Sequence, residues 1–153
     1  MSGSKYDHLI VTDLKHPSSE PSWNPPVTTA GGGKGGRVLY LDSELVPGAF
    51  YMETVWVFPR PRLSPQEYEA RKKVSPGPHS HTYDEVIAFF GSDYNNPHEL
   101  NGEVELWLGD EKHTITKTAL VFIPAGLRHA PLLFIEVKKP IFHYTTGPGK
   151  MYY

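Results

Sequence analysis

The sequence predicts an all-β fold, either an antiparallel sandwich or a barrel. Three observations lead to this prediction. Many short segments are rich in β-branched and aromatic residues, 15 prolines and 14 glycines separate them, and only one segment carries the signals that start a helix. Short strands divided by turn residues are typical of all-β sandwiches and barrels. A chain of 153 residues has the size of a single domain.

The first part of the chain is predicted to be an irregular arm, residues 1–36, before a barrel domain at residues 37–153. Residues 12–36 are rich in proline, glycine and serine, and include a glycine-rich run at 31–36. Such residues disfavour a helix. A phosphate-binding glycine loop is the alternative for this run, but that motif needs a strand before it and a helix after it. Trp23 favours an arm that docks on the rest of the chain.

The barrel domain begins with two predicted strands and the single predicted helix. Residues 38–41 and 49–58 have the aromatic and branched composition of strands. Ser64 at the cap, Pro65 at the first helical position and Glu67 three residues after the cap then form a helix-start signal. We therefore expect one short, exposed helix after residue 64.

The rest of the chain is predicted to form further short strands. Their expected ranges are 85–90, 103–108, 112–116, 120–123, 132–137 and 140–145, with a tight hairpin at 109–111. Residues 91–102 connect two of these strands and are about ten residues longer than a hairpin needs. This insertion is either a surface loop or a lid over one end of the barrel that brings His98 or Tyr94 to a site.

Composition and charge narrow the function classes. The net charge is -2 and no basic block is present, which argues against a nucleic-acid partner. No apolar run approaches the roughly 20 residues of a membrane span, and we expect no membrane partner. The N-terminus lacks the apolar core of a secretory signal. The absence of cysteine excludes disulfides and thiolate ligands, so we expect a cytoplasmic protein whose metal ligands are nitrogen and oxygen.

A candidate metal site is the strongest functional signal. His79, His81 and Glu85 occupy odd positions, so on an extended strand they point to one face, and His129 follows later. Imidazole and carboxylate suit iron(II), manganese, nickel, zinc or copper(II). The alternative is that these histidines are buried, hydrogen-bonded core residues. A buried carboxylate such as Glu85 nevertheless requires a cation or a hydrogen-bond partner.

The same residues resemble the two motifs of the cupins. Residues 77–91 resemble the first motif, His-x-His, three residues, Glu and then a glycine. Residues 120–129 resemble the second, Pro-x-Gly followed by a histidine. Lys73 and Thr118-Ala119 depart from the usual turn residues of these motifs, but no ligand is changed. The resemblance covers about residues 38–147 and implies a double-stranded β-helix (jelly-roll) barrel, a homodimer, and His79, His81, Glu85 and His129 as metal ligands.

The resemblance also implies metal-dependent chemistry on a small organic molecule. A mononuclear non-haem metal oxygenase with one divalent ion per chain is the favoured interpretation, and iron(II) the favoured ion. Three histidines and one glutamate leave two neighbouring positions on an octahedral ion for water, oxygen or substrate. The alternatives are a lyase or isomerase that uses the ion as a Lewis acid, and a non-catalytic, metal-dependent binding protein.

Further side chains are weaker candidates for the site. The candidate catalytic residues are Tyr83, on the same strand face as the ligands, and His143, on the last predicted strand. The candidate substrate-binding residues are Phe89, Trp56, Arg128 and His98. Tyr83 could equally be a packed barrel residue and Arg128 part of a surface ion pair. Because Glu53 and Trp56 lie on opposite faces of their strand, at most one of them faces inward.

Overall fold

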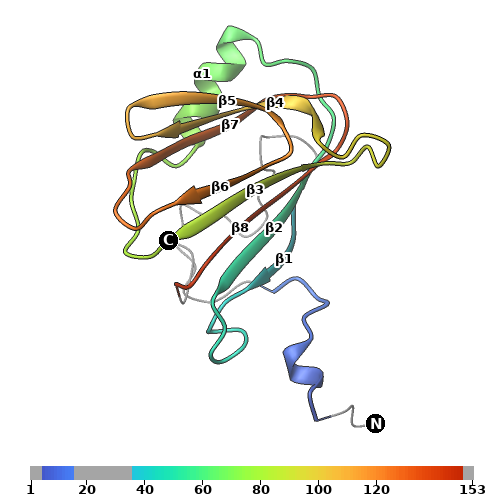
Figure 1. Ribbon diagram of the computed structural model, residues 1–153, viewed down its shortest axis with the longest axis vertical. Helices are drawn as coiled ribbons and strands as arrows, with labels where there is room; N and C mark the ends of the chain where they lie inside the picture. Colours follow the sequence, from blue (N-terminus) through green and yellow to red (C-terminus); the bar gives the residue numbers. More distant parts are fainter. Residues whose placement is uncertain (1–4, 16–35, 150–153) are drawn as a thin grey trace.

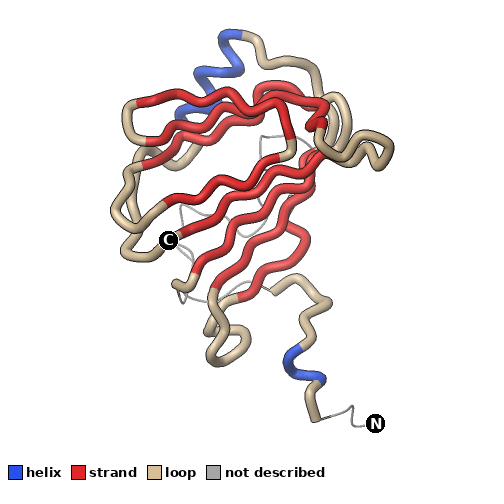
Figure 2. The backbone as a smooth tube through the Cα atoms, in the orientation of Figure 1, coloured by secondary structure: helices blue, strands red, loops and turns tan. Residues whose placement is uncertain are grey.

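Two antiparallel sheets face each other in the structure, a computed structural model that describes residues 5–15 and 36–149 (Figure 1). The larger sheet contains, in order, β1 (Arg37–Leu41), β2 (Tyr51–Val57), β8 (Ile141–Gly147), β3 (Glu85–Gly91) and β6 (Ala119–Ile123). The smaller sheet contains β5 (Glu111–Lys117), β4 (Glu99–Leu108) and β7 (His129–Val137). The two red layers of strands in Figure 2 are these sheets. The predicted all-β, jelly-roll barrel is confirmed.

The core fills the space between the two sheets. In β2, β3 and β8 the odd-numbered positions face inward, because directly paired residues share a face of the sheet. The buried cluster between the sheets comprises Val55, Val57, Ile87, Phe89, Leu100, Val104, Ile123, Phe134, Val137 and Ile141. The barrel is therefore packed with apolar side chains over most of its length.

The predicted helix is α1 (Pro65–Val74), and it begins as expected. The Ser64 side chain accepts a hydrogen bond from the Glu67 backbone, and the Glu67 side chain accepts one from the Ser64 backbone. The helix is attached to the outer side of the smaller sheet, where the Tyr68 hydroxyl donates to Glu105 of β4. A short 3-10 helix, η1 (Asp7–Leu9), was not predicted. Trp23 and most of the predicted arm lie outside the described residues.

Two strands begin three or more residues earlier than the sequence predicts. β4 begins at Glu99 rather than at residue 103, so the connection after β3 is reduced to residues 92–98. This loop leaves β3 at Gly91, six residues from Glu85, which is about 20 Å along a strand. Tyr94 in the loop is 88% exposed. The insertion is therefore a surface loop at the end of β3 away from Glu85, and the lid alternative is wrong.

β7 begins at His129 rather than at residue 132, and a β-bulge turns this histidine inward. Leu106 of β4 pairs with Leu132, but Leu108 pairs with His129, so β7 has one extra residue between these pairs. In a regular strand, His129 and Leu132 would lie on opposite faces because they are three positions apart, and His129 would face outward. Because of the bulge, His129 shares the interior face with Leu108 and Leu132.

The outer face of the larger sheet is uncharged. The outward residues of β2, β8, β3 and β6 are Met52, Thr54, Trp56, Phe142, Tyr144, Thr146, Val86, Ala88, Phe90, Leu120 and Phe122. Of these, Leu120 is 65% and Phe122 is 60% exposed. A solvated antiparallel sheet normally carries polar residues on its outer face.

Among the described residues, no helix is both long and apolar enough to cross a membrane.

Candidate metal centre

Two histidines from the loop before β3 and one from the start of β7 meet at one end of the barrel. One ring nitrogen of each of His79, His81 and His129 lies within 4.8 Å of the others. The ring centroids of His79 and His129 are 4.5 Å apart, and those of His81 and His129 are 5.2 Å apart. The expectation of one continuous strand through His79 and His81 is wrong, because β3 begins only at Glu85. The preceding loop nevertheless brings both rings to the same place.

Main-chain hydrogen bonds join the loop of His79 and His81 to the segment that enters β7. The His79 N–H donates to the His129 carbonyl at 3.0 Å, and the His129 N–H donates to the His79 carbonyl at 2.8 Å. The Gly126 N–H donates to the His81 carbonyl at 2.9 Å. The Asp84 side chain accepts from the Ala125 N–H at 2.9 Å. The positions of the histidines are thus fixed by the backbone.

Two of the histidines are oriented as metal ligands usually are. Nδ1 of His79 is 2.8 Å from the Gly77 carbonyl oxygen, and Nδ1 of His129 is 2.9 Å from the Leu127 carbonyl oxygen. A carbonyl oxygen can only accept, so Nδ1 carries the proton in both rings. Nε2 of His79 is then left with its lone pair for a cation, the arrangement in which protein carbonyls orient metal-bound histidines. Nε2 of His129 donates to Glu85 here, and a bound cation would replace that proton.

Glu85 adds a buried carboxylate beside the histidines. It is 1% exposed, its Oε1 is 3.2 Å from Nε2 of His129, and its Oε2 is 3.7 Å from Nε2 of His81. Burial would raise the pKa of Glu85, but hydrogen bonds from His129 and Tyr51 outweigh it and hold the pKa below its ordinary value. Burial would likewise lower the pKa of His129, but the hydrogen bond to Glu85 holds it above its ordinary value. The carboxylate is therefore ionised in the apolar interior.

Tyr51 belongs to this cluster and was missed by the sequence analysis. Its hydroxyl donates to Oε2 of Glu85, although Tyr51 is on β2 and Glu85 is on β3, with β8 between them. The available signal was its odd position in the predicted strand 49–58. That signal shows only that Tyr51 faces inward. The contact with Glu85 depends on the strand order, which the sequence does not give.

The two candidate catalytic residues lie in different places. The Tyr83 ring stacks on the His81 ring, with centroids 4.9 Å apart and planes at 13°, so Tyr83 adjoins the cluster. His143 faces the interior but pairs with Phe89, four residues beyond Glu85, about 13 Å along β3. Its ring stacks on Phe89, and Nδ1 is 3.1 Å from the Ala88 carbonyl oxygen. His143 is therefore packed in the barrel core.

The candidate substrate-binding residues are not gathered at the histidine cluster. Trp56 faces outward and packs edge-on against Phe142, with centroids 5.1 Å apart, whereas Glu53 faces inward and pairs with Arg37. His98 is exposed in the loop at the far end of β3. Phe89 is part of the core. Arg128 is exposed next to His129.

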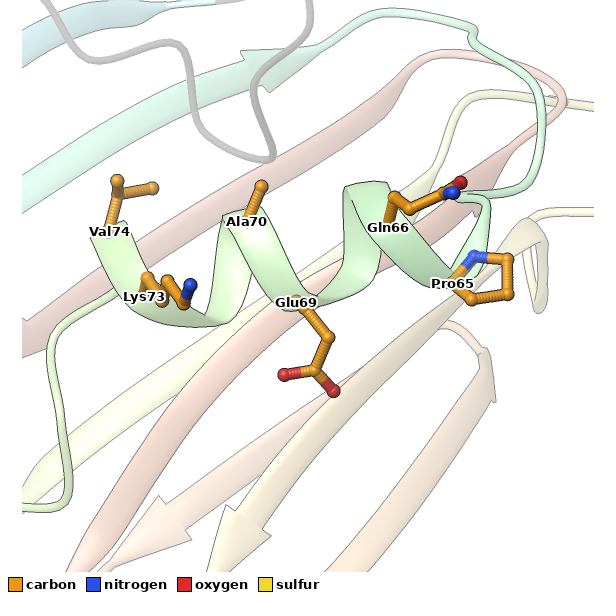
Figure 3. Close-up of a pocket in the computed structure, with 6 residues that line it drawn as sticks. All are labelled: Pro65, Gln66, Glu69, Ala70, Lys73 and Val74. Carbon is orange, nitrogen blue, oxygen red and sulfur yellow. The ribbon is translucent and has the colours of Figure 1, made fainter.

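A shallow hollow of ≈ 690 Å³ lies elsewhere, on helix α1 (Figure 3). Its lining residues are Pro65, Gln66, Glu69, Ala70, Lys73 and Val74. None of the predicted site residues lines it. The hollow is therefore separate from the histidine cluster.

Comparisons with known proteins support the fold. The sequence matches no protein-family model and no curated protein. A solved structure of oxalate oxidase in complex with the substrate analogue glycolate is 16% identical, with a TM-score of 0.53 over 99% of this chain and 64% of that chain. Recombinant oxalate oxidase in complex with glycolate gives 16% identity and a TM-score of 0.51 over 95% of this chain and 61% of that chain. The chain thus spans 64% of the first oxalate oxidase chain, and the likeness is one of fold.

The buried His143 is predicted to make the fold sensitive to acid. Burial lowers the pKa of His143 to about 4 from its ordinary 6.5, against smaller opposing effects of the Ala88 carbonyl and Glu85. Between pH 6.5 and 4 the unfolded chain therefore binds a proton that the folded chain does not. His143 therefore leaves the free energy of unfolding unchanged above pH 6.5. As the pH falls towards 4, it lowers that free energy by on the order of 3 kcal/mol.

The measurement is urea unfolding of wild type and His143→Phe from pH 7 to pH 4, with a chelator present throughout. Glu85 and His129 are present in both proteins, and so is their effect on the pH dependence of the unfolding free energy. The difference between the two curves therefore reports on His143. The variant should gain stability relative to wild type as the pH falls. Parallel curves would show that His143 already binds its proton in the folded state.

Proposed function

We propose that this chain is a metal-dependent enzyme that acts on a small organic molecule, with one divalent transition metal held by His79, His81, Glu85 and His129. The observation that carries the proposal is the convergence of three imidazoles, two from the loop before β3 and one from the start of β7, beside a buried carboxylate. The donor set fits the ion, because neutral imidazole nitrogen and carboxylate oxygen are the ligands of iron(II), manganese and related ions. Iron(II) is our favoured ion.

The residues around the histidine cluster determine from which side a substrate would reach a bound metal ion. A bound divalent ion supplies Lewis acidity and open coordination positions for a chelating substrate or oxygen. The apolar side chains of Ile87, Ile123 and Phe134 exclude water from the interior behind the cluster. His79 is only partly buried, unlike His81 and His129, so the cluster is open to solvent on the His79 side. A substrate would approach there and present its polar end to the histidines.

A mononuclear oxygenase is our first proposal for the reaction class. A polar end inside an otherwise apolar barrel suits a small organic molecule with one chelating group, and less so a sugar, which needs many polar partners. A Lewis-acid lyase or isomerase, and a non-catalytic binding protein, are the alternatives. Oxygen consumption coupled to product formation, with iron(II) present, supports the oxygenase. Turnover under anaerobic conditions would contradict it and support the lyase or isomerase.

Metal binding is predicted to depend on each of the four ligands. Wild-type protein dialysed against iron(II) or manganese(II) should retain one equivalent, measured by elemental analysis. His79→Ala, His81→Ala and His129→Ala should each reduce the retained metal several-fold, because each removes a donor atom. Glu85→Gln should do the same, because it removes the negative charge of the carboxylate ligand. The matched control is His113→Ala, since His113 is an exposed histidine on β5. Equal metal content in wild type and all four ligand variants would contradict the proposed ligands.

We also propose that the chain forms a homodimer through the outer face of the larger sheet. The outward positions of β2, β8, β3 and β6 carry no charge, so two copies of this face would meet without desolvating an ion. A two-fold axis brings the same patch of each copy together and makes such a face self-complementary. Exposed Phe90, Leu120 and Phe122 would then be covered.

The dimer is tested by light scattering coupled to size exclusion. Wild type should elute with the mass of two chains, and the double variant Leu120→Glu with Phe122→Glu should shift to the mass of one chain. Tyr94→Glu is the control, because Tyr94 is exposed on the distant loop at 92–98. A wild type of single-chain mass at all concentrations would contradict this interface, as would a double variant that stays dimeric.

A further inference from the structure

Tyr51 reaches Glu85 across an intervening strand. Tyr51 pairs with Gly147 of β8, and the register of β8 with β3 places Glu85 on the other side of the same glycine. Strands are about 4.8 Å apart, so the tyrosine spans roughly 10 Å between the two strands. Tyr51 is fully buried, and its hydroxyl donates to Oε2 of Glu85.

Gly147 is the reason that this contact exists. A Cβ atom at Gly147 would lie 3.2 Å from Cε1 of Tyr51, 3.3 Å from Cδ1 of Tyr83 and 2.6 Å from the carbonyl oxygen of Asp84. The last distance is shorter than real Cβ contacts allow, so a side chain here would force the backbone or the rings to move. The glycine thus opens a path over β8 for the Tyr51 ring.

Tyr83 completes the support of this ring. Its ring meets Tyr51 edge-on, with centroids 5.6 Å apart, and stacks on His81 on the way to the cluster. A Cβ atom at Gly149 would lie 2.6 Å from the Tyr83 ring, so this glycine also makes room for an aromatic side chain. The Tyr51 N–H donates to the Gly149 carbonyl at 3.0 Å, which joins the glycine segment to β2.

We propose that Tyr51 is a positioning residue that makes Glu85 a ligand through one oxygen. The hydroxyl holds Oε2, which is 3.7 Å from Nε2 of His81, whereas Oε1 lies closer to a histidine, 3.2 Å from Nε2 of His129. A carboxylate held in this way by Tyr51 would offer Oε1 to a cation. This inference rests on the proposed metal site and assigns a role to a residue that does not itself touch the ion.

The chain contains a matched control for this hydrogen bond. Tyr68 on α1 donates its hydroxyl to Glu105 on β4, the same chemical pair on the outer side of the smaller sheet. That bond raises the pKa of Tyr68 to about 12. Tyr51→Phe and Tyr68→Phe therefore each remove one hydroxyl from a tyrosine–glutamate pair, but only the first pair adjoins the histidines.

The test is manganese(II) titration of wild type, Tyr51→Phe and Tyr68→Phe, followed by electron paramagnetic resonance of the bound ion. Tyr51→Phe should weaken manganese affinity about 10- to 100-fold, as expected for loss of a hydrogen bond to a metal ligand. It should also change the spectrum, because the second carboxylate oxygen is released. Tyr68→Phe should leave both affinity and spectrum unchanged. Gly147→Ala should weaken binding in the same direction as Tyr51→Phe.

The outcomes separate this inference from the proposed metal site. Wild type that binds no manganese, iron or zinc would overturn both. Wild type that binds normally, with a Tyr51→Phe variant of equal affinity and identical spectrum, would overturn only the role of Tyr51. Equal losses of affinity in Tyr51→Phe and Tyr68→Phe would also overturn it, since they would show a general loss of stability.

Discussion

The burial of the Glu85 carboxylate is the constraint on which the rest of this site depends. An ionised carboxylate inside an apolar barrel costs several kcal/mol unless its oxygens are satisfied. Here Oε1 faces the His129 ring and Oε2 accepts the Tyr51 hydroxyl, so partners come from both sheets. Each partner has a structural requirement of its own. Tyr51 needs a glycine at position 147 to pass over β8, and His129 needs a bulge in β7 to face inward. The charged group thus explains local features that core packing alone would not require.

Hydrogen bonds to the main chain preorganise the histidines. His79 and His129 exchange two main-chain hydrogen bonds, and both rings donate from Nδ1 to a carbonyl two residues earlier in the chain. The side chains are therefore fixed by short local contacts within loops that are themselves joined. A site built on joined backbones loses little conformational freedom when it binds a cation, because its loops are ordered beforehand. This explains how His79 and His81, which lie in a loop, can be placed as precisely as His129 at the start of β7.

The sequence predicted the fold class, the capped helix and the residues of the histidine cluster, but for partly different reasons from those in the structure. His79 and His81 were expected to meet Glu85 by strand parity, whereas a loop brings them there. His129 has outward parity relative to Leu132, and only the bulge reverses it. A motif can encode such irregular backbone, but periodicity cannot, because a single extra residue inverts every later side chain. Tyr51 was missed for another reason: its contact is two strands away in the sheet, and a single sequence does not fix strand order.

The interior of the barrel is divided into a polar end and an apolar body, and this division limits where chemistry can occur. At the polar end, Tyr51, Gly147 and Glu85 form one row of neighbouring positions across β2, β8 and β3, and the Tyr51 hydroxyl donates to Glu85. Two rows further along, Val55, His143 and Phe89 pack against Phe134. A neutral histidine enclosed by aromatic rings, with its Nδ1 on a main-chain carbonyl, is satisfied without a substrate. Substrate that entered this far would have to displace packed rings, at the cost of the core that holds the two sheets together. Under the proposed function, reacting groups would therefore be confined to the solvent side of the histidines. The chelating end of a substrate would reach the cluster while its remainder stayed near the loops at 75–84 and 124–128.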